Sequence, residues 1–428
     1  MALASLERDE APAPKALAGA AALSGGLLLL LLQSRRRSVS ARHKRIVAGA
    51  SALNDFVAKS LQPALDSYSP AWWTNAHVQV FLPFVLPQPR LAYKRDVLVM
   101  KDGGHTSLDW VVEASAPPSL ARRPLRDDSP IALVMHGLTG GSESMRSLCA
   151  AALAGGYRPV VFNKRGHGGL KLATPTLQAF GDTADLKEGI AQIERAFPAS
   201  SQLYGIGYSA GAGLLCSYLG ETGDASRIAA GVFISPGYDA VELFCRGRVH
   251  RFYDVLMTFT LKRLLLTHRE ELRGVVDLPA ALRATSVAEF DKHVYAKMHG
   301  FASAEAYWAR NDPLRAIGAI RRPVLCINAL DDPVCAKETI PYAHFAASAV
   351  TMLVETGEGS HCAFFEGALA PESWANKAAV AYLDGVREFQ HGRQAAAAPV
   401  AAAAARDARA IAAPQTRLVS ELAQANQT

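Results

Sequence analysis

The sequence predicts an α/β fold in which a mostly parallel central sheet has helices on both faces. Short apolar runs recur at wide intervals along the chain, and helical patterns fill the gaps between them. Strands that are apolar throughout and alternate with helices are typical of a parallel sheet that is buried on both sides. The runs that predict these strands are Ile131–Met135, Val160–Phe162, Leu203–Gly207, Gly231–Ile234, Val324–Asn328 and Thr351–Val354.

Composition limits the class of protein. The chain has 428 residues, 50% of them hydrophobic, which is enough for a substantial core in one large domain with appendages or in two modest domains. Much of the net charge of +6 comes from a local basic cluster between Arg35 and Arg45, so it does not predict a nucleic-acid-binding face. The six cysteines lack the dense pairing of a small secreted scaffold, and we expect them to be mostly reduced.

The N-terminal segment carries a membrane signal. Residues 16–32 are uncharged, end in six leucines and meet the basic cluster directly, which predicts a single-pass anchor; a cleaved signal or an organellar targeting segment is the alternative. The basic flank places the C-terminal side in the cytoplasm by charge asymmetry, but it does not identify the organelle. We therefore divide the chain into an anchor with its flank (1–45), a folded domain (46–390) and an alanine-rich disordered tail (391–428).

Two other stretches complete the predicted domain. Helical spacing predicts a lead-in helix over Ile46–Leu61, and Asp96–Met100 with Ser107–Glu113 predicts a β-hairpin. The strand pattern lapses between Ile234 and Val324, an interval too long for a simple crossover. We expect a helical cap at about residues 240–315, inserted before the strand that carries the candidate acid. A last helix is expected from Ser373 to Phe389.

Two groups of apolar side chains leave their use open. Trp72, Trp73, Phe81 and Phe84 could form a wall of a substrate site, although packing in the core is the favoured interpretation. The segment between Arg246 and Arg273 mixes arginines and lysine with leucines and phenylalanines. It could be a lid that lies on an anionic bilayer, but we favour a cap helix with leucines toward the pocket and arginines toward water.

A serine between glycines is the strongest single motif. Gly207-Tyr208-Ser209-Ala210-Gly211 has the G-x-S-x-G spacing that places a serine on a sharp turn between a strand and a helix. The apolar run before the motif predicts the strand, and the apolar stretch after it predicts a buried helix. The pattern arises by chance in glycine-rich chains, so its significance depends on the residues found at the ends of the other predicted strands.

A glycine-rich loop comes directly after the first parallel strand. In His136–Gly141 the glycines allow backbone N–H groups to turn toward a developing negative charge, and we expect Leu138 and Ala210 to supply the two oxyanion-hole donors. His136 could be a catalytic base, but a histidine beside such glycines is more often a support for the loop.

An acid and a base lie after the last two predicted strands. Asp331 and Asp332 come after one strand and His361 after the other, which supplies the carboxylate and imidazole that a serine nucleophile needs. Spacing does not decide between the two aspartates; we favour Asp332, and Asp239 is a weaker rival. The order Ser209, Asp332, His361 is the one expected of an α/β-hydrolase.

With these residues in place, the chain resembles the α/β-hydrolase superfamily, and within it the branch of membrane-anchored lipases and esterases that includes plant embryogenesis-associated proteins. The motifs that carry the resemblance are Trp72–Gln79, Asp102–Gly104, Leu108–Trp110, His136–Ser142, Asn163–Gly166, Thr174–Pro175, Asp185–Leu186, the Ser209 turn, Glu289–Asp291, Gly300–Phe301, Tyr307, Asn328–Pro333, His361 and Phe364–Glu366. The resemblance implies Ser209 as nucleophile, Asp332 as orienting acid and His361 as general base. It also implies hydrolysis of carboxylic esters, often lipid acyl esters, and an N-terminal anchor.

Departures from the branch and rival functions qualify this expectation. His167 and Asn311–Asp312 replace smaller residues and put the shape of the pocket in doubt, while the missing histidine-x4-aspartate box weakens an acyltransferase interpretation.

A non-catalytic lipid- or partner-binding protein, or an acyltransferase or thioesterase, remains an alternative. The chain has no H-E-x-x-H and no phosphate-binding P-loop, so we expect no metal and no cofactor. An ester or lipid substrate and the membrane are the expected partners, without nucleic acid; the oligomeric state is open.

Overall fold

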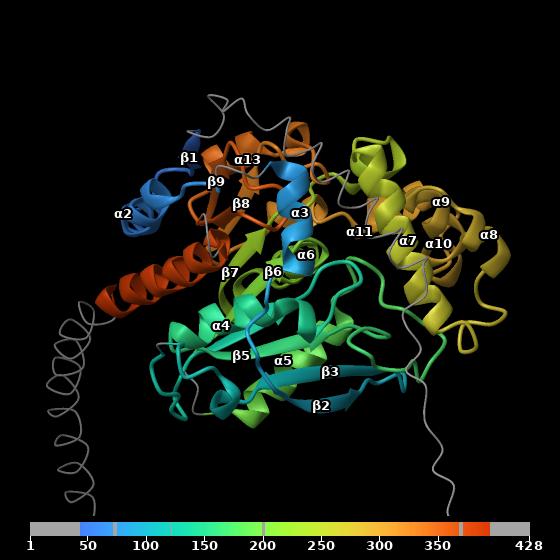
Figure 1. Cartoon of the computed structure of the whole chain (residues 1–428), viewed down its shortest axis with the longest axis horizontal. Helices are drawn as coiled ribbons and strands as arrows, with labels where there is room; N and C mark the ends of the chain where they lie inside the picture. The colour runs from blue at the N-terminus through green and yellow to red at the C-terminus, as the bar shows by residue number, and fades with distance from the viewer. Residues whose placement is uncertain (1–42, 72–74, 121, 199–201, 368–370, 394–428) are drawn as a thin grey trace, which may run out of the picture.

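A nine-stranded sheet forms the centre of the protein, in the order β1-β9-β8-β7-β6-β4-β5-β3-β2 (Figure 1). The computed structural model describes residues 43–71, 75–120, 122–198, 202–367 and 371–393. The strands are β1 (Lys44–Val47), β2 (Tyr93–Val99), β3 (His105–Val111), β4 (Ile131–Met135), β5 (Arg158–Asn163), β6 (Leu203–Tyr208), β7 (Ile228–Ile234), β8 (Val324–Ala329) and β9 (Thr351–Thr356), with a separate small pair β10 (Phe365–Glu366) and β11 (Glu372–Ser373).

The six central strands, β4 to β9, pair in parallel, as their continuous apolar sequences predict. Their carboxyl ends therefore meet at one edge of the sheet, where functional groups collect in folds of this class. Antiparallel strands close both sides: β1 pairs with β9, and the predicted hairpin of β2 and β3 joins β5.

Helices cover both faces of the sheet and complete two cores. On one face α2 (Ala52–Ser67), α4 (Arg146–Ala154) and a helix over residues 374–393 pack against alternate side chains such as Ala132 and Val134. On the other face α5 (Ala184–Ala196), α6 (Ala210–Thr222) and α13 (Tyr342–Ala347) pack against Ile131, Leu133 and Met135. Because successive strand residues point to opposite faces, one short apolar strand serves both cores.

The predicted lead-in helix is wrong at its start. Ile46 and Val47 lie in β1, where Ile46 pairs with Val354 of β9, because β-branched side chains suit an extended strand. The helix α2 begins only after Ser51, whose side chain accepts a hydrogen bond from the Asn54 N–H and so caps the helix.

The interval between β7 and β8 forms helices, as the lapse in the strand pattern predicts. It contains η5 (Val241–Cys245), α7 (Arg251–Thr267), α8 (Leu278–Arg283), α9 (Val287–His293), α10 (Tyr295–Met298), α11 (Ala304–Asn311) and α12 (Leu314–Ile317). Helices α7 to α11 share a core of their own at one end of the molecule (Figure 1). We call α7 to α11 the cap. The domain limits at residues 45 and 390 stay predictions.

The surface helices correct one expectation about apolar side chains and add an observation to another. Phe84, on α3 (Ala76–Val85), is 81% exposed, so the expectation that it packs in the core is wrong. On α7, Leu261 and Leu265 are buried and the arginines are exposed, as the favoured interpretation expects, but Phe252 and Phe259 face outward as well. Trp72 and Trp73 lie outside the described residues.

The predicted anchor at residues 16–32 also lies outside the described residues, as does the tail from residue 394 onward. Among the helices that the structure describes, none combines the length and the apolar character needed to cross a bilayer. The anchor stays a prediction from the sequence.

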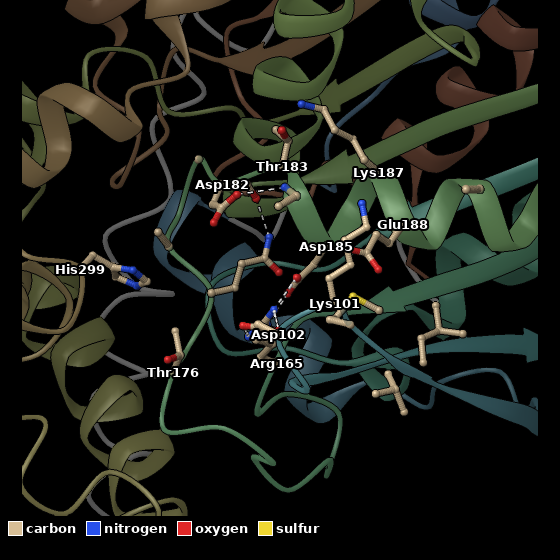
Figure 2. Close-up of a pocket in the computed structure, with 18 of the residues that line it drawn as sticks. Lys101, Asp102, Arg165, Thr176, Asp182, Thr183, Asp185, Lys187, Glu188 and His299 are labelled. Carbon is tan, nitrogen blue, oxygen red and sulfur yellow. Dashed lines mark hydrogen bonds and ion pairs between the residues drawn. The ribbon is translucent and has the colours of Figure 1, made fainter.

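A buried arginine ties the β2–β3 turn to α5 (Figure 2). Arg165 Nε lies 2.5 Å from Asp185 Oδ2, and its Nη1 lies 2.6 Å from Asp102 Oδ2. The side chains of Arg165 and Asp185 are only 9% and 7% exposed, whereas that of Asp102 is 54% exposed. Loss of the guanidinium would therefore leave a buried carboxylate without its partner.

We expect Arg165→Met to lower the free energy of unfolding by about 3–5 kcal/mol, because an unpaired charge is then buried at Asp185. Asp102→Asn, which weakens the exposed arm of the network, should lower it by less than about 1 kcal/mol. Urea denaturation followed by circular dichroism measures both. Equal losses in the two variants would contradict this account of the network.

Candidate functional site

Ser209 occupies a strained turn between β6 and α6. Its φ of 50° and ψ of −116° lie where side chains other than glycine are rarely found. The turn packs closely on its neighbours: a Cβ at Gly211 would lie 2.3 Å from the Met135 carbonyl oxygen, and one at Gly207 would lie 2.5 Å from the Gly211 oxygen. Glycine is therefore required on both sides of the serine, which explains the G-x-S-x-G spacing.

Three of the predicted side chains form one hydrogen-bonded chain. His361 Nε2 lies 2.9 Å from Ser209 Oγ, and His361 Nδ1 lies 2.9 Å from Asp332 Oδ2. The other carboxylate oxygen of Asp332 accepts the N–H groups of Val334 and Cys335, each at 2.8 Å. With a proton on Nδ1, His361 donates to Asp332, and its Nε2 is free to accept the proton of the Ser209 hydroxyl.

The charge of Asp332 controls the basicity of His361. Burial is the largest single effect and lowers the pKa of His361, because it disfavours the imidazolium, but the charge and hydrogen bond of Asp332, together with the nearby Cys362 and Cys335, raise the pKa well above its ordinary value overall. The Asp332 side chain is fully buried and that of His361 is 15% exposed. This interaction is thus shielded from water and from salt.

The neighbouring acids have different partners. Asp331 accepts the Ser360 N–H at 2.8 Å and so holds the loop that carries His361. Burial raises the pKa of Asp331 to about 7. Asp239 accepts the N–H of Glu242 at the start of η5. The structure therefore places Asp332, and neither Asp331 nor Asp239, against the imidazole.

The loop that carries His361 is held in an unusual conformation. Ser360, Cys362 and Phe364 have φ values of 58°, 61° and 49°. The Cys362 N–H donates to Ser235 Oγ at 2.9 Å, which ties this loop to the end of β7. Repeated positive φ angles outside glycine are costly and persist only where the surroundings fix them.

The loop after β4 lies beside Ser209. A Cβ at Gly137 would be 3.9 Å from the Ser209 Cβ, so the two backbones approach closely. The carbonyl oxygen of Gly137 lies 2.8 Å from His136 Nδ1 and 3.4 Å from Lys164 Nζ. Because C=O and N–H point in opposite directions across a trans peptide, anchoring this carbonyl fixes the direction of the Leu138 N–H. Ala210 opens α6, where first-turn N–H groups have no intrahelical partner.

The half-buried Lys164 and the buried His167 support this loop, although the sequence patterns did not assign them that role. Lys164 Nζ lies 3.4 Å and His167 Nε2 lies 3.0 Å from the carbonyl oxygen of Leu138. Burial lowers the pKa of Lys164 to about 7, and burial together with the Lys164 charge lowers that of His167 to about 3. Their position directly after β5, in Asn163-Lys164-Arg165-Gly166-His167, is a signal that could have identified them.

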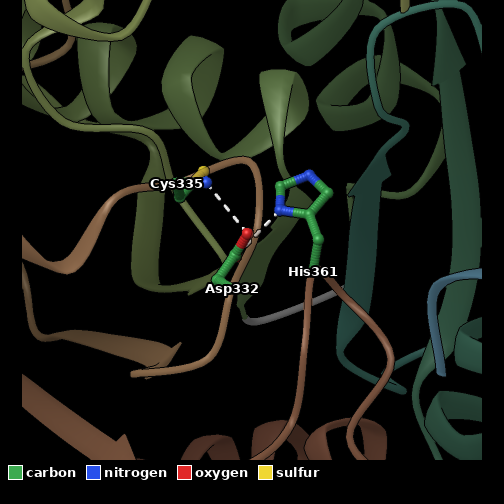
Figure 3. A group of neighbouring side chains, drawn as sticks. All are labelled: Asp332, Cys335 and His361. Carbon is green, nitrogen blue, oxygen red and sulfur yellow. Dashed lines mark hydrogen bonds and ion pairs between the residues drawn. The ribbon is translucent and has the colours of Figure 1, made fainter. Parts of the chain in front are cut away.

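Asp332, Cys335 and His361 also form the one group of potential metal ligands found among the described residues (Figure 3). Their donor atoms lie within 4.8 Å of one another. However, the carboxylate and imidazole are already hydrogen-bonded together, and burial raises the pKa of the Cys335 thiol to about 12, which disfavours the thiolate that metals bind. A metal here would have to break the Asp332–His361 hydrogen bond, so the residues suit proton transfer better.

A large open cleft lies elsewhere in the molecule (Figure 2). It has a volume of 1410 Å³ and is lined by β2, α5 and the cap, with Lys101, Asp182, Lys187 and Glu188 among its charged side chains. Ser209, Asp332 and His361 do not line it. The candidate site is therefore defined by the hydrogen-bonded side chains rather than by the size of a cavity.

Comparison with known proteins gives one matching family model, described as alpha/beta hydrolase fold, over residues 130–368. The human Protein ABHD15 is 32% identical over 80% of this chain and 74% of its own length. The mouse Phospholipase ABHD3 is 28% identical over 76% of this chain and 80% of its own length. The mouse Monoacylglycerol lipase ABHD2 is 28% identical over 80% of this chain and 85% of its own length.

Among solved structures, the esterase Pf2001 of Pyrococcus furiosus is similar with a TM-score of 0.40 and 18% sequence identity. The match covers 63% of this chain and 85% of that chain.

We expect Asp332→Asn to lower the pKa of His361, because the neutral amide no longer favours the imidazolium while burial still disfavours it. Titration of the ring nitrogens of His361 by 15N NMR measures this pKa in both proteins. In the wild type the imidazolium should persist above the ordinary pH range of histidine. An unchanged titration in the variant would show that Asp332 does not control the imidazole.

Proposed function

The chain belongs to the α/β-hydrolase family, and from this premise we propose that it hydrolyses carboxylic esters with Ser209 as the nucleophile. The observation that carries the proposal is the continuous hydrogen-bonded chain Ser209–His361–Asp332, with 2.9 Å at both links. A serine hydroxyl is a weak nucleophile at neutral pH unless a base within hydrogen-bond reach accepts its proton. Here the base is in place, and it is oriented by a carboxylate.

The geometry supports a two-step reaction. Ser209 Oγ attacks the ester carbonyl carbon as its proton passes to His361 Nε2, and Asp332 stabilises the resulting imidazolium. The N–H groups of Leu138 and Ala210 stabilise the negative oxygen of the tetrahedral intermediate. His361 then protonates the leaving alcohol, which leaves an acyl group on Ser209. Water, deprotonated by His361, then attacks the acyl carbon. The bond between that carbon and Ser209 Oγ breaks, His361 returns the proton to Oγ, and the carboxylic acid leaves with the serine hydroxyl restored.

We further propose that the substrates are lipid acyl esters. Two relatives carry the names phospholipase and monoacylglycerol lipase, and each aligns over at least three quarters of this chain. A non-catalytic binding protein would not need an aligned serine, imidazole and carboxylate, which favours the enzyme over that alternative.

A fluorophosphonate probe should label the wild-type protein covalently and should not label Ser209→Ala, because the probe reacts with an activated serine. Ester hydrolysis should be lost together with the label. Gel fluorescence measures the labelling, and thermal unfolding checks that the variant is folded. Labelling that survives Ser209→Ala would exclude this serine as the nucleophile.

The two neighbouring aspartates should differ sharply in their effect on turnover. Asp332→Asn should lower kcat by about 10⁴-fold, since the amide disfavours the imidazole tautomer that accepts the serine proton. Asp331→Asn should have a much smaller effect, because an amide oxygen can still accept the Ser360 N–H. Steady-state kinetics on a soluble ester compares the two. A larger loss for Asp331→Asn would reverse the assignment.

A further inference from the structure

The outer side of α7 carries an apolar stripe beside exposed arginines. Phe252, Val255, Phe259 and Leu266 are 54%, 48%, 56% and 43% exposed, and their spacing places them on one side of the helix. On the opposite side of the helix, Tyr253, Leu261 and Leu265 are buried, with exposures of 2%, 1% and 0%. A surface helix of a globular protein normally shows polar residues to solvent, so this stripe needs a partner.

Helix α3 adds exposed apolar side chains beside this stripe. Its Phe84 and Val85 are 81% and 74% exposed. The two helices are joined by Phe81, whose ring lies 6.3 Å from that of Phe252 and 6.4 Å from that of Tyr253. Figure 1 shows α3 and α7 along the same side of the molecule. We call this surface the α3–α7 face; its apolar members are Phe84, Val85, Phe252, Val255, Phe259 and Leu266.

The basic side chains of α7 have no counter-ion among the residues that the structure describes. Arg251, Lys262 and Arg263 form no ion pair with any residue that the structure describes. The acid of this helix, Asp254, is half-buried, accepts the Val287 N–H at 2.8 Å and forms no ion pair with them among the described residues. Exposed phenylalanines beside unpaired arginine and lysine match the boundary of an anionic bilayer, where rings enter the acyl region and cations meet lipid headgroups.

The inner side of the same two helices lies against the candidate site. The Tyr253 hydroxyl is 2.9 Å from His77 Nδ1 on α3, and Tyr253 packs in one cluster with Val334 and Cys335, which come just after Asp332. Ser360, directly before His361, donates its hydroxyl to the Ala76 carbonyl oxygen at 2.5 Å. Helices α3 and α7 therefore separate the apolar face from the hydrogen-bonded side chains by a single layer.

We propose that the α3–α7 face docks on the surface of an anionic lipid bilayer and inserts its aromatic side chains below the headgroups. Docking would place the candidate site next to the membrane, so that an ester lipid reaches Ser209 without crossing water. The docking itself does not depend on the proposed chemistry; only this role in substrate delivery rests on the proposed function. The interaction is separate from the predicted anchor at residues 16–32.

Quenching of an added tryptophan tests insertion in the full-length chain. Phe259→Trp is mixed with vesicles of brominated phosphatidylcholine, with or without phosphatidylglycerol. We expect the emission gained over the wild type to be quenched by the brominated lipid, and more strongly in vesicles that contain phosphatidylglycerol. Val97→Trp is the control, because Val97 is 50% exposed on β2, outside the α3–α7 face. Equal quenching at the two positions, or none at position 259, would overturn the proposal.

Hydrolysis separates docking from catalysis. Val255→Asp and Val97→Asp form a matched pair, since the two valines are 48% and 50% exposed. We expect Val255→Asp alone to lower hydrolysis of a vesicle-borne ester lipid, by about tenfold, because it removes the gain from burying an apolar side chain in the bilayer. Both variants should keep fluorophosphonate labelling and hydrolysis of a soluble ester. A wild-type protein that is neither labelled by the probe nor able to hydrolyse the soluble ester would reject the proposed function, not the docking.

An exposed apolar face could also bind a second copy of this chain. Sedimentation of the wild type and of Val255→Asp tests this alternative. We expect both to sediment alike. A wild-type dimer that Val255→Asp dissociates, with unchanged hydrolysis of vesicle-borne lipid, would overturn membrane docking and assign the face to self-association.

Discussion

The parallel pairing of β6 to β9 is the constraint on which the candidate site depends. Backbone hydrogen bonds continue past the strand ends: Ser209 N–H donates to Ile234 O, Ser235 N–H to Ile327 O and Leu330 N–H to Thr356 O, at 2.9, 2.9 and 2.8 Å. The position along the sheet at which each loop begins is therefore set by hydrogen bonds to the neighbouring strand. Side chains more than a hundred residues apart meet within hydrogen-bond distance because the ladder sets where their loops begin.

Strain is concentrated where the ladder ends. Ser209, Ser235, Ser360 and Cys362 all have positive φ angles, although none is glycine. Their surroundings hold them: Ser235 Oγ accepts the Cys362 N–H, and Asp331 accepts the Ser360 N–H. These contacts help to hold the imidazole and the serine hydroxyl within hydrogen-bond distance of each other.

Polar side chains perform different tasks in the two halves of the sheet. Around β5, Arg165 and its two aspartates fasten the hairpin to α5, while Lys164 supports the loop that carries Leu138. Around β8 and β9, Asp332 controls the charge of His361. In the cap, the two sides of α7 differ: leucines pack into the cap core, and two phenylalanine rings are exposed on the outer side.

The sequence by itself determined the parallel sheet, the order of its strands along the chain and the three loops that carry Ser209, Asp332 and His361, because apolar strands and glycine turns are local patterns. It could not decide between Asp331 and Asp332, since neighbouring side chains point in different directions and only the fold shows which one meets the imidazole. It also misplaced Ile46 in a helix, because β1 exists only by pairing with β9, more than three hundred residues away. The outward stripe on α7 likewise appears only in the tertiary structure, since the sequence shows which side chains share a helix face but not which face the cap core covers.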